Sequence, residues 1–296
     1  MTLPDKSGNY ENFRGETFLK CLKLNEKAKL NCLKGSERSM KPIVVKIGGS
    51  TLGNHDTTLE DLVELQKKGV SITVVHGGAK VTSGWLARLG IPTSFINGLR
   101  VTDAETLKVV AAALGGQVNK ELVVAIQALG GEAIGLSGCD GNLLRATIKN
   151  SELGYAGEIV AVDPAPLRLL LEKGYMPIVA PISFGSVEGR MMLLNVNGDA
   201  AAGAIAAALN AERLIFLTDV DGICDASGKV ISRLNIAEAK ALLNSKVASG
   251  GMIPKIEASL KALTTAPIVR IIDGRMPHAL LNETRNEIGG TTIVPE

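Results

Sequence analysis

Two lysines and one aspartate in this sequence have surroundings suited to the transfer of an anionic group. Lys46 lies inside an otherwise apolar run, 43–47, where an unpaired ammonium group would be costly to bury. We expect it to point from the strand end toward an anion, or else toward solvent as a surface lysine. Lys255 follows a glycine-rich turn that can deliver its side chain into a cleft. Asp199 begins an alanine-rich helix, where it can hold both lysines or cap the helix.

Glycine follows three apolar runs at the points where buried strands are expected to end. These glycines are Gly48 and Gly49, Gly77 and Gly78, and Gly222 at the end of the turn 218–222. Ligands of open α/β sheets bind at the carboxyl ends of the strands, where glycine lets backbone N–H groups approach phosphate oxygens. Each of these segments alone can be no more than a tight turn. The three together suit a phosphate donor and an anionic acceptor.

The two common nucleotide-binding fingerprints are absent from the sequence. No Gly-x-Gly-x-x-Gly follows an expected strand, and the stretch 222–229 has one residue too many for a P-loop, with Val230 where Ser or Thr is required. A dinucleotide-dependent oxidoreductase is therefore an alternative that the glycine spacing disfavours. If the acceptor is a carboxylate, it is already ionised at pH 7, so a general base is unnecessary and the small number of histidines is no objection.

The composition favours a compact protein with small-molecule partners. With 296 residues, 46% hydrophobic and 21% charged, the chain can bury a large core, and a formal net charge of +2 gives no footprint for nucleic acid or an anionic membrane. Four cysteines without a Cys-x-x-Cys pair and three scattered histidines predict neither a metal site nor a disulfide framework, which suits the cytoplasm. We also find no run of about 18 uninterrupted apolar residues and no signal pattern, so we expect neither secretion nor a membrane span.

Residues 1–40 differ from the rest of the chain. They carry eight Lys or Arg against five Asp or Glu and lack a clean apolar period, although 18–33 can form a weak helix. Because Met40 stands directly before the first expected strand, this N-terminal extension is either an upstream start or an oligomerising arm. We assign nothing catalytic to it.

From residue 42 onward, short β-branched runs alternate with longer amphipathic or alanine-rich stretches, which predicts an α/β fold around a mostly parallel sheet. Expected helices cover 104–114, after a Thr-Asp cap signal, and 199–209. Two short strands near 143–147 and 191–195 are expected to form an antiparallel edge. The main strands are expected at 43–47, 71–75, 132–136, 176–179, 213–217 and 268–271.

The sequence from 41 to 296 resembles the amino acid kinase superfamily, and within it the N-acetylglutamate kinase family. An ordered set of motifs carries this resemblance and is far more specific than any one of them. The motifs lie at 46–49, 76–78, 97–102, 135–141, 195–199, 218–222, 250–255 and 271–275.

The resemblance implies a three-layer α/β/α sandwich around a mainly parallel open sheet. It implies an N-terminal lobe, 41–190, for acceptor binding and dimerisation, and a C-terminal lobe, 191–296, for ATP binding. By the same likeness, Arg100 would clamp the α-carboxylate of N-acetyl-L-glutamate and Asn195 would hold its acetamido end. The backbones of three glycines would face the transferred phosphoryl group and the acceptor: Gly49, Gly77 and Gly78.

The resemblance also assigns the catalytic group and the nucleotide site. Lys46 and Lys255 would stabilise the transition state while Asp199 orients both of them. ATP would bring Mg²⁺ with it, so no metal ligand of the protein itself is expected. The ATP-binding residues implied are Gly48, Thr218, Asp219, Val220 and Gly222.

The activity implied is ATP-dependent phosphorylation of N-acetyl-L-glutamate to N-acetyl-L-glutamyl 5-phosphate, a step of arginine biosynthesis. A carrier-protein-linked aminoadipate kinase of lysine biosynthesis is an alternative, because it shares the motifs 135–141 and 198–199. A catalytically idle regulatory homologue that binds an amino acid is another. We expect a cytoplasmic homodimer, with a hexamer left open. The segment 271–281 resembles arginine-inhibited members, and His278 in it is either structural or near an effector.

Overall fold

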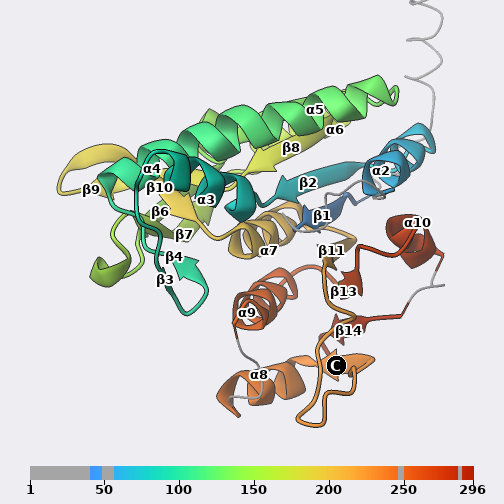
Figure 1. The fold of residues 1–296 in the computed structure, drawn as a ribbon. Helices are drawn as coiled ribbons and strands as arrows, with labels where there is room; N and C mark the ends of the chain where they lie inside the picture. The colour runs from blue at the N-terminus through green and yellow to red at the C-terminus, as the bar shows by residue number, and fades with distance from the viewer. Residues whose placement is uncertain (1–40, 49–56, 246–249, 286–288) are drawn as a thin grey trace, which may run out of the picture. The chain divides into compact units, whose positions relative to one another are not determined.

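The computed structural model describes residues 41–48, 57–245, 250–285 and 289–296. Its main feature is an eight-stranded sheet with the strand order β12-β14-β13-β11-β1-β2-β8-β5. Figure 1 labels β1, β2, β8, β11, β13 and β14 of this sheet. Three predictions lie outside the described residues: the extension 1–40, its helix 18–33, and the role of Gly49.

Six central strands of this sheet run parallel. Every residue of β1 and β8 is buried, as expected for strands that are covered on both faces. All six main strands lie within two residues of their predicted bounds, which confirms the α/β class. They are β13 (Val269–Asp273), β11 (Arg213–Thr218), β1 (Ile43–Ile47), β2 (Ile72–His76), β8 (Met176–Ala180) and β5 (Ala133–Ser137).

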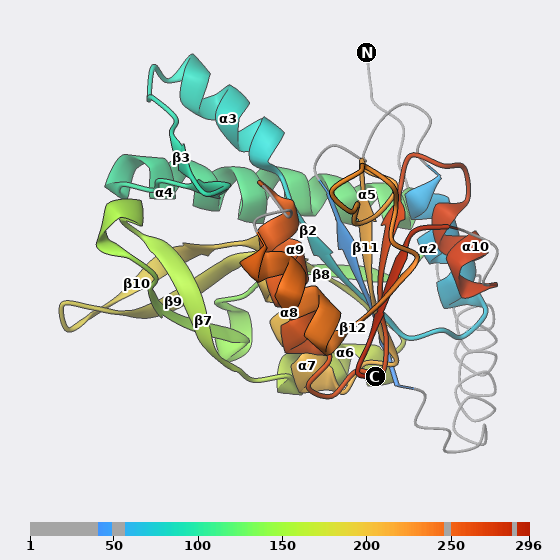
Figure 2. The same cartoon turned by 90° about the horizontal axis from the view of Figure 1, so that it is seen from below.

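Helices cover both faces of the sheet and give the three layers that were expected (Figures 1 and 2). Side chains of β1 alternate between two apolar clusters: Val45 packs into one, whereas Val44 packs into the other. The first cluster includes residues of α2 (Thr58–Lys67), α5 (Asn119–Ala128) and α10 (Ala279–Thr284). The second includes residues of α6 (Ala165–Glu172), α7 (Gly198–Leu209), α8 (Ile236–Asn244) and α9 (Met252–Ala262).

The expected antiparallel edge is placed differently in the structure. The predicted short strands exist as β6 (Leu144–Ile148) and β10 (Arg190–Val196), but they join β7 (Ala156–Val162) and β9 (Ile182–Val187) in a separate closed sheet. Gly185 permits this tight closure, since a Cβ there would lie 1.9 Å from the carbonyl oxygen of Ala146. The antiparallel edge of the main sheet is instead formed by β14 (Thr291–Val294) on β13, with β12 (Arg233–Asn235) beyond it.

The helix predicted at 104–114 is longer than expected. It begins as α4 (Ala104–Ala111), where the Asp103 carboxylate accepts a hydrogen bond from Thr106 N at 2.7 Å, and continues through a π-helical segment (Ala112–Val118) into α5. Packing therefore overrides the two glycines that follow residue 114. By length and composition alone, 104–128 could cross a membrane, but Val118, Leu122 and Ile126 are buried against the sheet, as in a core helix.

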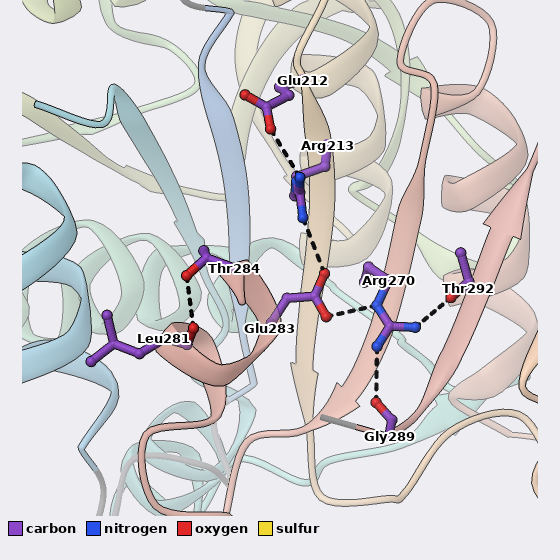
Figure 3. A network of polar contacts seen from close by, with 8 residues as sticks. All are labelled: Glu212, Arg213, Arg270, Leu281, Glu283, Thr284, Gly289 and Thr292. Atoms are coloured by element: carbon purple, nitrogen blue, oxygen red, sulfur yellow. Dashed lines mark hydrogen bonds and ion pairs between the residues drawn. The ribbon is translucent and has the colours of Figure 1, made fainter. Parts of the chain in front are cut away.

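A buried polar network fastens the C-terminal strands to α10 (Figure 3). Glu283, only 1% exposed, accepts a hydrogen bond from Arg270 Nε at 2.7 Å and pairs with Arg213 Nη1 at 3.4 Å. Arg270 also donates to Thr292 Oγ1 and, at 3.0 Å, to Gly289 O. Two guanidinium groups thus compensate the buried carboxylate.

His278 connects α10 to α2. Its Nδ1 lies 2.7 Å from Asp61 Oδ1, and its backbone N–H donates to Thr57 Oγ1 at 2.7 Å. Burial raises the pKa of Asp61, although the contact with His278 opposes that rise. His278 therefore makes a structural contact, and a role near an effector stays a prediction.

The remaining elements lie between these helices and strands. They are α3 (Ala79–Arg88), the hairpin β3 (Phe95–Ile96) and β4 (Leu99–Arg100), and two 3₁₀ turns (Asp140–Asn142 and Ser151–Leu153).

Close packing of α7 on α9 depends on Gly203, because a Cβ there would lie 2.4 Å from Ala258 O. We expect Gly203→Ala to lower the free energy of unfolding by about 1–3 kcal/mol through overpacking. The matched control is Gly84→Ala in α3, where a Cβ meets nothing within 4 Å. This substitution should raise the free energy of unfolding by up to about 1 kcal/mol, because alanine favours the helix. Urea unfolding measures both variants, and equal effects would contradict this account of the α7–α9 contact.

Candidate active site

Three charged side chains meet at the carboxyl end of β1. Lys46 Nζ lies 2.6 Å from Asp199 Oδ1, and Lys255 Nζ lies 3.1 Å from Asp199 Oδ2. The strand supplies Lys46, α7 supplies Asp199 and α9 supplies Lys255. The structure thus brings together the three residues of the candidate catalytic group.

Asp199 is free to hold the lysines because another residue caps its helix. Asn197 Oδ1 accepts hydrogen bonds from Asp199 N at 2.9 Å and Ala200 N at 3.1 Å, which satisfies two of the N-terminal amides of α7. Burial pushes the pKa of Asp199 upward, but the attraction of Lys46 and Lys255 outweighs it and holds the pKa below its ordinary value. Two ammonium groups and one carboxylate leave one net positive charge, which favours a further anion.

A cleft of about 970 Å³ opens beside this cluster. Its walls come from the ends of β1 and β2, the β3–β4 hairpin, the closed sheet and α9. Such a volume is in the range of sites for small molecules and cofactors. The predicted residues that line it are Lys46, Gly77, Gly78, Arg100, Asn195 and Asp199.

Arg100 presents a buried guanidinium group to the cleft. It is 8% exposed and lies over the Phe95 ring at 4.8 Å, and its Nη2 donates to Ser83 Oγ at 2.9 Å and Ala79 O at 3.2 Å. Burial lowers its pKa. Its buried Nη1 has no hydrogen-bond partner among the residues that the structure describes. A planar fork with a free donor is suited to binding a carboxylate.

Asn195 is connected to Arg100, at the end of β4, through the hydroxyl group of Thr102. Its Nδ2 donates to Thr102 Oγ1 at 3.0 Å, and Thr102 Oγ1 in turn donates to Arg100 O at 2.9 Å. The two residues predicted to hold the acceptor are therefore connected to each other as well as lining one cleft.

The two glycines after β2 differ in what their backbones offer. Gly77 N donates to Ile47 O at 3.0 Å, so its N–H group is occupied. Gly78 precedes the first residue of α3, and within the described part of the chain its N–H group has no acceptor. A Cβ at Gly78 would lie 2.4 Å from Leu114 Cδ2, so any larger residue would force the Leu114 side chain to shift. The N-termini of α3 and α7 add partial positive charge to this end of the cleft.

The predicted nucleotide turn lies at the end of β11, outside the lining of the cleft. Thr218 Oγ1 donates to Val220 O at 2.8 Å, and Asp219 and Val220 are exposed. Gly222 is buried, and a Cβ there would lie 2.7 Å from Thr291 Oγ1. Gly48 N donates to Leu217 O at 3.2 Å, which places it beside this turn. Across the described residues, no three His, Cys, Asp or Glu side chains form a group that could hold a metal ion.

Sequence reasoning missed four side chains that shape this site. Ser83 contacts Arg100 and Thr102 contacts Asn195, the two residues predicted to hold the acceptor. Asn197 caps α7 in place of Asp199. The fourth, Asn119, donates from Nδ2 toward His76 Nε2 at 3.2 Å. An Asn directly before an alanine-rich helix is a cap signal that identifies Asn197, whereas the other three contacts join residues far apart in sequence.

The fold and the cleft define an α/β protein with a cluster of charged side chains in a cleft at the ends of parallel strands. The chain belongs to the amino acid kinase family, whose model matches residues 41–273. A protein of Dehalococcoides mccartyi named acetylglutamate kinase is 44% identical over 262 residues, 88% of this chain and 96% of that protein. An acetylglutamate kinase of Thermosynechococcus vestitus is 45% identical over 264 residues, covering 86% of this chain and 88% of that protein. The crystal structure of smu.665 from Streptococcus mutans UA159 matches with a TM-score of 0.74 and 28% identity, covering 86% of this chain and 99% of that one.

His76, fully buried beside the cleft, should make stability depend on pH. Burial lowers its pKa from 6.5 to about 4, so between these values the unfolded chain binds a proton that the native state rejects. Stability is then full above pH 6.5 and falls as the pH is lowered, by about 2 kcal/mol from pH 7 to pH 5. Urea unfolding of wild type and His76→Asn at both pH values isolates this contribution. Equal losses in the two proteins would contradict it.

Proposed function

We propose that this chain catalyses the ATP-dependent phosphorylation of the side-chain carboxylate of N-acetyl-L-glutamate, giving N-acetyl-L-glutamyl 5-phosphate. The observation that carries the proposal is one cleft with two kinds of anion site. One is the buried Arg100, whose Nη1 has no hydrogen-bond partner among the described residues, and the other is the Lys46–Asp199–Lys255 cluster, of which Lys46 and Asp199 line the cleft. The relatives that this chain matches over most of their length are named acetylglutamate kinase, which supports the choice of acceptor.

Acceptor binding is proposed to use the fixed donors of the cleft wall. Arg100 can offer Nη1 to the α-carboxylate while Nη2 keeps its bonds to Ser83 and Ala79. Asn195 is proposed to hold the acetamido group, and its hydrogen bond to Thr102 sets the orientation of its amide. An acceptor held at both ends directs its side-chain carboxylate along the cleft, and such positioning lowers the entropy cost of the reaction.

In the phosphoryl transfer itself, one carboxylate oxygen forms a bond to the γ-phosphorus while the bond to the β–γ bridging oxygen breaks and ADP leaves. No proton moves, because the carboxylate is ionised at neutral pH. The reaction brings two anions together, and its transition state spreads negative charge over the equatorial oxygens. Lys46 and Lys255, held by Asp199, are the cations proposed to stabilise that charge.

The residues at the strand ends fit a triphosphate. The lysine cluster carries one net positive charge, and the N–H of Gly78, which has no acceptor in the described part of the chain, lies at the start of α3 in the same cleft. The turn formed by residues 218–222 is proposed to lie against the nucleotide, with Gly48 beside it. Mg²⁺ bound to the phosphates supplies charge neutralisation between them.

The test is trapping of the acyl phosphate with hydroxylamine in the presence of Mg-ATP. N-acetyl-L-glutamate, free glutamate, aspartate and N-acetyl-aminoadipate are compared as acceptors, and we expect hydroxamate chiefly with N-acetyl-L-glutamate. Arg100→Ala should raise the KM for this acceptor about 10- to 100-fold, because a charge-assisted contact is lost, with a smaller effect on kcat. The exposed Arg88→Ala is the matched control and should leave the KM unchanged.

Two outcomes would contradict the proposal. A preference for N-acetyl-aminoadipate would favour the carrier-linked aminoadipate kinase. ATP binding without hydroxamate from any acceptor would favour an idle regulatory homologue, even though the chain retains Lys46, Asp199 and Lys255.

A further inference from the structure

A buried imidazole lies directly behind the loop that faces the lysine cluster. His76, the last residue of β2, is 0% exposed. Its Nδ1 lies 2.7 Å from Gly77 O, and its Nε2 lies 3.2 Å from Asn119 Nδ2 at the start of α5. Neither His76 nor Asn119 has a role in the proposed acceptor binding or phosphoryl transfer, so the burial of this polar pair needs another explanation.

The orientation of the Asn119 amide follows from its other partners. Lys120 Nζ can only donate, and it lies 3.0 Å from Asn119 Oδ1. The Nδ2 group points to backbone acceptors: Ile178 O at 2.8 Å and Leu136 O at 3.3 Å. The contacts therefore assign oxygen and nitrogen of this amide without ambiguity.

That orientation determines the tautomer of His76. Because Asn119 Nδ2 is a donor, the facing Nε2 of His76 must carry a lone pair, and the ring proton is on Nδ1. An imidazolium ion would set a second N–H against the amide, and burial independently keeps the ring neutral by lowering its pKa to about 4. His76 Nδ1–H therefore donates to Gly77 O.

This hydrogen bond fixes a peptide plane between two glycines. Gly77 N is held by Ile47 O at 3.0 Å and Gly77 O by the His76 ring. In a planar trans peptide the N–H of Gly78 points away from the carbonyl oxygen of Gly77. The ring lies on the α5 side of the sheet, where Asn119 is, so the N–H of Gly78 points toward the opposite side, where Lys46 meets Asp199 of α7. Two consecutive glycines have little intrinsic preference for one orientation.

We propose that His76, with its tautomer set by Asn119, is a positioning residue that holds the Gly77–Gly78 peptide so that the N–H of Gly78 donates to the transferring phosphoryl group. This inference rests on the proposed function. It adds a neutral, preorganised donor to the two lysines, and a donor of this kind is worth about 10²- to 10³-fold in kcat where it acts in the transition state.

Two variants of equal polarity separate this role from a structural one. The amide nitrogen of Asn is bonded to Cγ, as Nδ1 of histidine is, so His76→Asn keeps a donor for Gly77 O. The longer His76→Gln places its nitrogen near the position of Nε2 and loses that donor. We expect His76→Gln to lower kcat by about 10²-fold at unchanged KM for ATP, and His76→Asn to recover about tenfold or more of that loss. Thr73→Val is the control, since Thr73 is fully buried in the same strand and its Oγ1 has no hydrogen-bond partner among the described residues.

Thermal unfolding of each variant and ¹⁵N NMR of the His76 ring accompany the kinetics. Equal kcat values for the Asn and Gln variants, or losses that follow Tm alone, would overturn the inference. A ring protonated on Nε2 would overturn it whatever the activity. If the wild-type protein forms no hydroxamate, the proposed function fails, and a spectrum with the proton on Nδ1 still supports the assigned tautomer.

Discussion

The site depends on one buried carboxylate shared by two ammonium groups. Asp199 is 5% exposed, and each of its oxygens lies within 3.1 Å of a lysine nitrogen. Removing one cation from such a buried group leaves charge uncompensated, which is costly, so the three side chains form one unit. The unit keeps a net positive charge at the carboxyl end of β1, where we propose that the transferred phosphoryl group lies.

The rest of the fold brings this unit together from distant parts of the chain. β1 supplies Lys46 from the centre of the sheet, and α7 and α9 approach closely enough for Asp199 and Lys255 to meet because Gly203 removes a side chain between the helices. The opposite face of the sheet contributes through His76 and Asn119, which hold the backbone after β2. The cleft therefore has charged groups on one side and oriented peptide groups on another.

Much of this arrangement could be predicted from local sequence. Six strands were located because apolar, β-branched runs of the right length are typical of strands that are buried on both faces. Lys46 stood out as a charge within such a run. The continuation of α4 past residue 114 and the closed sheet that contains β6 and β10 were not predictable, because both depend on tertiary packing around glycines. Ser83, a partner of Arg100, and Asn119, a partner of His76, lie 17 and 43 residues away in sequence and carry no local signal.

The most direct test of the central claim is the steady-state kinetics of Lys46→Met with Mg-ATP and N-acetyl-L-glutamate. Methionine keeps the length of the side chain and removes its charge, so kcat should fall by about 10²-fold or more while the KM for ATP changes by less than about tenfold. Lys108→Met, on the exposed surface of α4, is the matched control. A kcat for Lys46→Met within about threefold of wild type would show that the buried cluster does not stabilise the transition state.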